Sequence, residues 1–241
     1  IIEEGFPISD LERIIRSMKE AAEDAGVQII AGDTKVVNRG AADKIFINTA
    51  GVGVIRDNVN ISGRNAKVGD TVIVNVTMGD HGVTILSMRE GLAFDVPLES
   101  DSAPLNGLVA DMLAVSDKIH AMRDPTRGGL ATTLNEIALQ SNVGIELVES
   151  RLPFREGVEG ACELLGLDPL YLANEGKLVA FVAPEDGEKI LACMKAHPYG
   201  RDAAIIGTVV PENRGRVFLK TVIGGTRILD MLAGEQLPRI C

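Results

Sequence analysis

The feature that most constrains the fold of this chain is a repeated change between helical and strand-like spacing of its apolar residues. Between residues 9 and 24 the apolar side chains recur every three or four positions, which predicts an amphipathic helix. Ser9 with Glu12 three residues later predicts its N-cap, and Gly26 predicts its end. The side chains that give this spacing are Leu11, Ile14, Ile15, Met18 and Ala22.

The same change continues along the chain. β-branched apolar runs predict strands, and segments with helical spacing predict helices between them. The sequence therefore predicts a mixed α/β or α+β fold, with a domain boundary between residues 76 and 82 where the pattern changes. Strands are expected within 27–31, 43–55, 66–76, 143–149, 176–184, 203–211 and 215–222, and helices within 80–93, 101–142 (two helices) and 185–197.

Composition excludes several classes of protein. The 241 residues are 46% hydrophobic, which is enough to form a core. A net charge of −10, the lack of Trp and the lack of a long apolar run argue against a nucleic-acid surface and against a transmembrane helix. Three scattered cysteines and three scattered histidines indicate a reducing compartment and no metal cluster. The first residues contain no signal peptide and look like the middle of a protein.

The stretch GDTKVV, which begins at Gly32, follows the expected strand at 27–31. Gly32 allows close approach of the backbone, Asp33 can hold a divalent cation, and Thr34 and Lys35 can donate to phosphate oxygens. The stretch therefore suits a site for phosphate and magnesium. The alternative is an ordinary turn with a solvated lysine.

A second stretch, RDPTRGGLATTLNEIA, begins at Arg123. Asp124 and Thr126 are expected to cap a helix whose first turn holds Gly128 and Gly129, so its amide groups and positive dipole end would face an anion. Arg127 adds a positive charge. The alternative is that the two glycines serve only close packing of the helix.

The third stretch, NEGKL, precedes an apolar strand and contains Glu175. A partly buried carboxylate in such a loop can act as a general base, because burial disfavours its charged form and so raises its pKa. A solvated turn carboxylate is the alternative for Glu175. The fourth stretch is the end of the sequence, LPRIC, where Cys241 could move between sites as a carrier, or be an accident of where the chain stops.

Taken together and in this order, GDTKVV, RDPTRGGLATTLNEIA, NEGKL and LPRIC resemble the HypE family of hydrogenase maturation proteins. That family belongs to a superfamily with aminoimidazole ribonucleotide synthetase, selenophosphate synthetase and thiamine monophosphate kinase. The resemblance implies a PurM-like two-domain fold. Residues 1–75 would be the last part of an ATP-binding, dimerising domain, 76–232 a complete C-terminal α/β domain, and 233–241 a flexible tail that carries the modified cysteine.

The resemblance also implies a reaction: ATP-dependent dehydration of a carboxamide on Cys241 to a thiocyanate, which supplies a cyanide ligand to the iron of nickel-iron hydrogenase. Asp33 would help to hold Mg²⁺, Lys35 would neutralise charge on the transferring phosphoryl group, and Glu175 would take a proton from the carboxamide nitrogen. The ATP-binding residues would be Gly32, Asp33, Thr34, Lys35, Thr126, Arg127 and Gly128.

The implied partners are a second copy of the protein, the carbamoyltransferase HypF and the iron-carrying HypC–HypD complex, with no nucleic acid and no membrane, in the cytoplasm. HypE-like chains carry a further segment before the point where this sequence begins, so the chain alone is expected to bind ATP weakly or not at all. Two alternatives remain: a small-molecule kinase or synthetase of the same superfamily, or a non-catalytic scaffold that presents Cys241.

Overall fold

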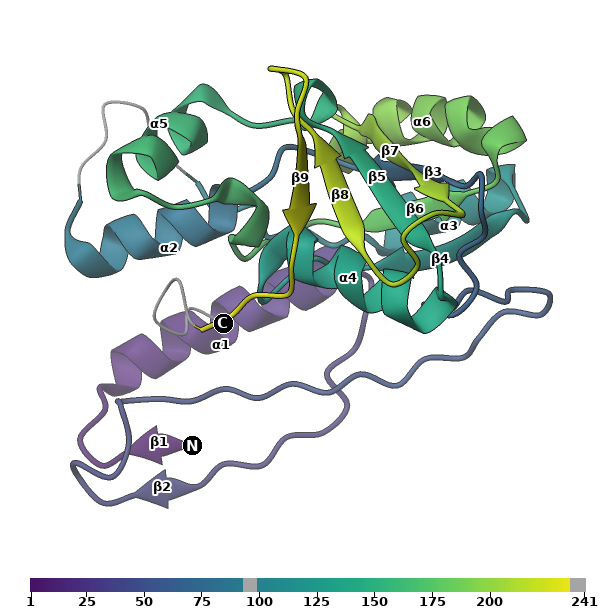
Figure 1. Cartoon of the computed structure of the whole chain (residues 1–241). Helices are drawn as coiled ribbons and strands as arrows, with labels where there is room; N and C mark the ends of the chain where they lie inside the picture. The colour runs from purple at the N-terminus through teal and green to yellow at the C-terminus, as the bar shows by residue number, and fades with distance from the viewer. Residues whose placement is uncertain (93–98, 235–241) are drawn as a thin grey trace. The chain divides into compact units, whose positions relative to one another are not determined.

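The computed structural model describes residues 1–92 and 99–234, which form two compact units (Figure 1). Unit 1 is Ile1–Asp57 and unit 2 begins at Asn58. The mixed α/β fold class predicted from the sequence is confirmed. The strand β3 (Thr71–Val74) pairs inside the sheet of unit 2.

Unit 1 contains β1 (Ile2–Glu3), α1 (Ile8–Asp24) and β2 (Val36–Val37), and β1 pairs with β2 in parallel. The predicted helix is confirmed, and Gly26 follows it in the left-handed region with φ of 64°. The predicted cap is wrong. Pro7 is the N-cap, and its carbonyl accepts from the Leu11 N–H at 3.1 Å, so Ser9 already lies inside the helix.

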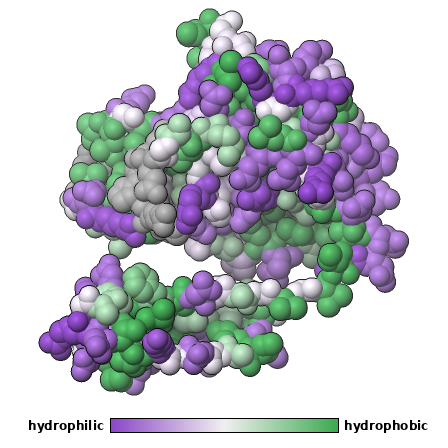
Figure 2. Space-filling view, turned by 60° about the horizontal axis from the view of Figure 1, so that its bottom comes forward, coloured by the Kyte–Doolittle hydropathy of each residue, from purple (hydrophilic) through white to green (hydrophobic). Residues whose placement is uncertain are grey.

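The strands predicted within 27–31 and 43–55 are wrong. A strand needs hydrogen-bonding neighbours, and in these two segments only Ile45 forms a bridge, with Ile2. The apolar side chains there are exposed: Ile30 is 88% exposed and Val52 is fully exposed. Figure 2 shows hydrophobic surface on this unit.

Unit 2 is built on one seven-stranded mixed sheet, in the order β4-β6-β3-β7-β5-β8-β9. All neighbouring strands are antiparallel except β5 and β8. Five of the predicted strands are confirmed, whereas β4 and β9 were not predicted. The remaining strands are β4 (Ile119–Arg123), β5 (Gly144–Val148), β6 (Val179–Val182), β7 (Ala204–Val210), β8 (Val217–Lys220) and β9 (Thr226–Leu229).

Helices cover both faces of this sheet. Four of the five α-helices described in unit 2 were predicted and are confirmed, and α5 was not predicted. They are α2 (Asp80–Glu90), α3 (Asn106–Val115), α4 (Gly129–Ser141), α5 (Glu156–Leu165) and α6 (Gly187–Ala196). Short 3-10 turns join them: η1 (Glu149–Arg151), η2 (Pro169–Tyr171), η3 (Pro184–Asp186) and η4 (Pro198–Gly200).

The alternation of side chains along β3 shows how the core is divided. Val72 and Val74 join a cluster that includes Leu134 of α4, whereas Ile73 joins a second cluster with Met112 of α3. Both faces of the strand are therefore buried, which explains its uninterrupted apolar sequence. A third, smaller cluster joins α2 and α5.

We expect Phe181→Ala to destabilise unit 2 strongly. Phe181 is fully buried in β6 and lies opposite Val72 of β3 and Ala121 of β4. Truncation leaves a cavity, so the free energy of unfolding in urea should fall by roughly 3–5 kcal/mol. The matched control is Val222→Ala, since Val222 is 72% exposed and its truncation should change stability by less than about 0.5 kcal/mol. Equal effects of the two substitutions would contradict the assigned core.

Candidate functional site

The loop before α4 is built by glycines rather than by side-chain caps. Gly128 is the N-cap, with φ of 77°, and no side chain bonds to the helix start, so the predicted capping by Asp124 and Thr126 is wrong. The Gly129 N–H instead donates to the Thr126 carbonyl at 3.0 Å. A Cβ on Gly129 would lie 2.5 Å from the carbonyl oxygen of Leu170, so close packing accounts for this glycine. Within the loop, Arg127 is exposed and Thr126 is half-buried.

Asn174 ties this loop to two other segments. Its amide nitrogen donates to the carbonyl oxygens of Pro125, at 2.9 Å, and of Leu172, at 3.0 Å. Its amide oxygen accepts from the N–H of Gly79, the residue before α2, at 2.8 Å. The side chain is 1% exposed. Three segments far apart in sequence therefore meet at one buried amide.

Glu175 follows directly and is half-buried. Its N–H donates to Oδ1 of Asp101 at 3.3 Å. The next residue, Gly176, packs against the same segment, because a Cβ there would lie 1.7 Å from the Asp101 carbonyl oxygen. Asn75 holds the far side: its amide donates to the Gly176 carbonyl and accepts from Leu178. The backbone around Glu175 is thus fixed from two sides.

Beneath this loop lies an ionic cluster that the sequence analysis missed. Lys177 is 2% exposed, and its ammonium contacts the carboxylates of Asp80, at 3.0 Å, and of Asp101. Asp80, in the first turn of α2, also accepts from the Thr77 hydroxyl at 2.8 Å and lies 3.3 Å from the Arg155 guanidinium. A lysine that opens the apolar run KLVAFV was a signal for a buried cation, which requires carboxylate partners.

The GDTK stretch lies in unit 1, and its four residues Gly32, Asp33, Thr34 and Lys35 are all exposed. Asp33 accepts from the Thr34 N–H at 2.9 Å, and the Lys35 carbonyl accepts from the Ile2 N–H. The stretch leads into β2 rather than following a strand, contrary to the expectation. Its donors and its carboxylate have the chemistry that phosphate and magnesium require.

None of the other predicted site residues lies in unit 1. Unit 2 brings the Thr126–Gly128 loop and Glu175 together through Asn174. Cys241 lies outside the described residues. Within residues 1–92 and 99–234, no three His, Cys, Asp or Glu side chains converge as ligands of a metal ion.

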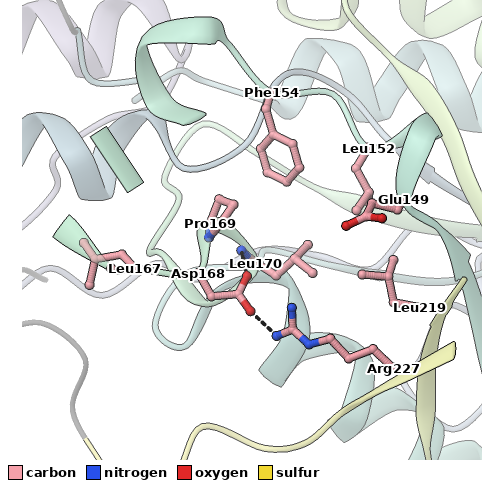
Figure 3. A pocket seen from close by; sticks show the side chains of 10 residues that line it. Glu149, Leu152, Phe154, Leu167, Asp168, Pro169, Leu170, Leu219 and Arg227 are labelled. Carbon is pink, nitrogen blue, oxygen red and sulfur yellow. Dashed lines mark hydrogen bonds and ion pairs between the residues drawn. The ribbon is translucent and has the colours of Figure 1, made fainter. Parts of the chain in front are cut away.

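Unit 2 also contains a cavity of about 330 Å³ that is lined in part by residues of η1 and η2 (Figure 3). Leu152, Phe154 and Leu219 line its apolar part, and an ion pair between Asp168 and Arg227 lies at its side. Asp168 also accepts from the Leu170 N–H at 3.0 Å, so these charges are already partnered. The cavity contains none of the described residues that were predicted for the site.

Both cysteines in the described part of the chain, Cys162 and Cys193, have thiol pKa values above the ordinary value. Burial, with further contributions from Asp168 and Glu159, raises the pKa of the Cys162 thiol from 9.0 to about 11. Burial and then Asp111 raise the pKa of the Cys193 thiol. Because the thiolate is the reactive form, neither side chain suits a role as an acceptor of groups near neutral pH.

Comparisons with known proteins match both halves of the chain. The model of the AIR synthase related protein N-terminal domain matches residues 2–55, and that of the C-terminal domain matches residues 67–220. The carbamoyl dehydratase HypE of Azotobacter vinelandii is 56% identical over all of this chain, which spans 71% of that relative.

Two solved structures extend the comparison. A crystal structure of a HypE–HypF complex has a TM-score of 0.93 at 51% identity and matches 96% of this chain and 75% of the solved one. A crystal structure of HypE in complex with ATP has a TM-score of 0.89 at 46% identity and matches 100% of this chain and 73% of the solved one.

None of the helices in the described residues is long and apolar enough to span a membrane.

The two family matches identify the chain as an AIR synthase related protein of PurM-like fold. Within that class, the chain belongs to the HypE family. This confirms the family to which the four sequence stretches pointed.

We expect Asn174→Ala to lower both stability and the order of the site. The substitution leaves the Gly79 N–H and the Pro125 carbonyl without their buried partner, which costs about 1–3 kcal/mol of unfolding free energy. Urea unfolding measures this loss. The control is Gln140→Ala, which removes an exposed amide at the end of α4 and should change little. An unchanged unfolding free energy for Asn174→Ala would contradict the described role.

The raised pKa of the Cys162 thiol predicts that the stability of the protein changes with pH. Its folded pKa of about 11 lies above the ordinary 9.0, so the folded state keeps a proton that the unfolded chain releases. This contribution is present below about pH 9 and is lost as the pH rises towards 11. Wild-type protein should therefore lose stability relative to Cys162→Ala across this range, and all other titrating groups cancel in the difference. A difference independent of pH would contradict burial of the thiol.

Proposed function

We propose that this protein uses ATP to dehydrate a carboxamide carried on the sulfur of Cys241 to a thiocyanate, whose nitrile serves as a cyanide ligand for the iron of nickel-iron hydrogenase. Membership of the HypE family supports this proposal. The observation that carries it is the buried Asn174 bond that holds the Glu175 loop beside the Thr126–Gly128 loop. A candidate base is thereby kept next to a helix start that suits an anion.

Cys241 is the acceptor in this proposal. The chain has three cysteines, and the raised pKa values of Cys162 and Cys193 argue against a thiolate at either position. A substrate that visits a loading enzyme, a dehydration site and a metal acceptor must be carried on a tail that can reach all three. We therefore assign the carrier role to Cys241.

The chemistry needs a better leaving group than an amide oxygen. In the proposed reaction, the oxygen of the S-carboxamide attacks the γ-phosphorus of ATP, and ADP leaves. The nitrogen then loses its protons, the C–O bond breaks, and phosphate departs with the oxygen, which leaves an S–C≡N group. The net change is the loss of the elements of water from the carboxamide, and ATP becomes ADP and phosphate.

Each proposed residue has a defined role in these steps. Glu175 takes a proton from the carboxamide nitrogen, and Lys35 neutralises charge on the transferring phosphoryl group. Asp33 contributes to a magnesium site, where the ion would screen the phosphate charges. The remaining ATP contacts come from Gly32, Thr34, Thr126, Arg127 and Gly128.

The proposed partners follow from the same route. HypE has been crystallised with HypF and with ATP, which supports HypF as the enzyme that loads the thiol and ATP as the second substrate. The HypC–HypD complex would receive the nitrile, a second copy of the protein would complete the ATP domain, and all would work in the cytoplasm.

The experiment is intact-protein and peptide mass spectrometry of the full-length protein with HypF and carbamoyl phosphate, before and after addition of magnesium ATP. We expect an adduct of about 43 Da on the peptide that ends in Cys241, and then an ATP-dependent loss of about 18 Da. Cys241→Ser should show neither change, whereas Cys162→Ser should show both. If the protein consumes ATP on a small molecule while the tail stays unmodified, it is instead a kinase or synthetase. If it consumes no ATP, it is a scaffold.

The substitution Glu175→Gln tests the proposed base without changing the carrier residue Cys241. The variant should accept the carboxamide on Cys241 at the normal rate. It should then dehydrate the carboxamide on the order of 100- to 10,000-fold more slowly, because the glutamine side chain cannot take a proton. Accumulation of the adduct in the same mass spectra measures this. The matched control is Glu185→Gln, since Glu185 is exposed and pairs with Lys118 at 2.8 Å. Dehydration at the wild-type rate in Glu175→Gln would rule out Glu175 as the base.

A further inference from the structure

We propose that Lys177 is a positioning residue for the dehydration: its ammonium, held between Asp80 and Asp101, fixes the carboxylate-bearing loop at Glu175. This inference rests on the function proposed above and adds a residue to it. Lys177 itself is 2% exposed, so it would act through Glu175 rather than on the substrate.

The connection runs through Asp101. One carboxylate oxygen of Asp101 contacts the Lys177 ammonium, and the other accepts from the N–H of Glu175 at 3.3 Å. The same aspartate therefore binds both ends of the three-residue segment Glu175–Lys177. The Lys177 N–H closes the segment into a tight turn by donating to the Glu175 carbonyl at 2.8 Å.

Asp80 anchors the cluster to a helix. It lies in the first turn of α2, where the positive end of the helix dipole favours a carboxylate, and its side chain is 3% exposed. Its bond to Lys177 joins the Glu175 loop to the same helix start that Asn174 reaches through Gly79. Two separate buried contacts thus hold the loop against α2.

The cost of burying these charges supports a specific role. A buried ion pair seldom stabilises a fold more than well-packed apolar side chains of similar size would. A buried lysine between two aspartates is therefore poorly explained by stability alone. It does define one position for the backbone that carries Glu175, and a shift of about 1 Å at a reacting group can slow a reaction on the order of 100-fold.

The test is a double-mutant cycle in the full-length protein, with the ATP-dependent loss of water from carbamoyl-loaded Cys241 as the measured rate. We expect Lys177→Met to slow this step on the order of 10- to 100-fold while loading by HypF and the KM for ATP stay unchanged. In the Glu175→Gln background the same substitution should change the residual rate by less than about threefold, because its effect passes through Glu175.

Equal losses in the two backgrounds would overturn the inference and leave Lys177 with a structural role only. If Lys177→Met fails to fold, Asp101→Asn tests the same connection with a side chain of the same shape, and an additive loss would again overturn it. Lys118→Met, which breaks an exposed ion pair with Glu185, is the control. A wild-type rate in Glu175→Gln alone would reject the proposed base, which is a different outcome from additivity.

Discussion

The structure of the site depends on one buried ammonium. Lys177 cannot be buried without counter-charges, and its two partners come from the start of α2 and from the segment before α3. Pairing the Lys177 ammonium with these carboxylates therefore brings together three parts of the chain that lie up to 97 residues apart. The sheet supplies the fixed frame for this, since Lys177 directly precedes the buried run that forms β6.

The same region depends on close approach between backbones. Gly129 packs against the backbone of 170–172 and Gly176 against that of Asp101, where any Cβ would collide. These contacts leave Asn174 and Asp101 within reach of the main-chain groups they bond. Small residues and buried polar side chains therefore act together to fix the backbone that carries Glu175.

Local sequence rules predicted the elements and missed the connections between them. Periodicity located α1, α2 and most strands of the large sheet, and the loops at Thr126–Gly128 and Glu175 were identified by composition. The contacts of Lys177 with Asp80 and Asp101 depend on long-range topology, which spacing does not encode. The strand expected at 27–31 failed for a related reason: an apolar run forms a strand only when a neighbour accepts its hydrogen bonds, and Ile30 is exposed.

In the proposed reaction, phosphoryl transfer from ATP removes the carboxamide oxygen on Cys241. The most direct test loads the full-length protein with a carboxamide whose oxygen is oxygen-18, adds magnesium ATP, and measures where the isotope goes. We expect one oxygen-18 atom in the inorganic phosphate, formed at the rate at which the thiocyanate appears. Thiocyanate formation with unlabelled phosphate would contradict phosphoryl activation of the amide.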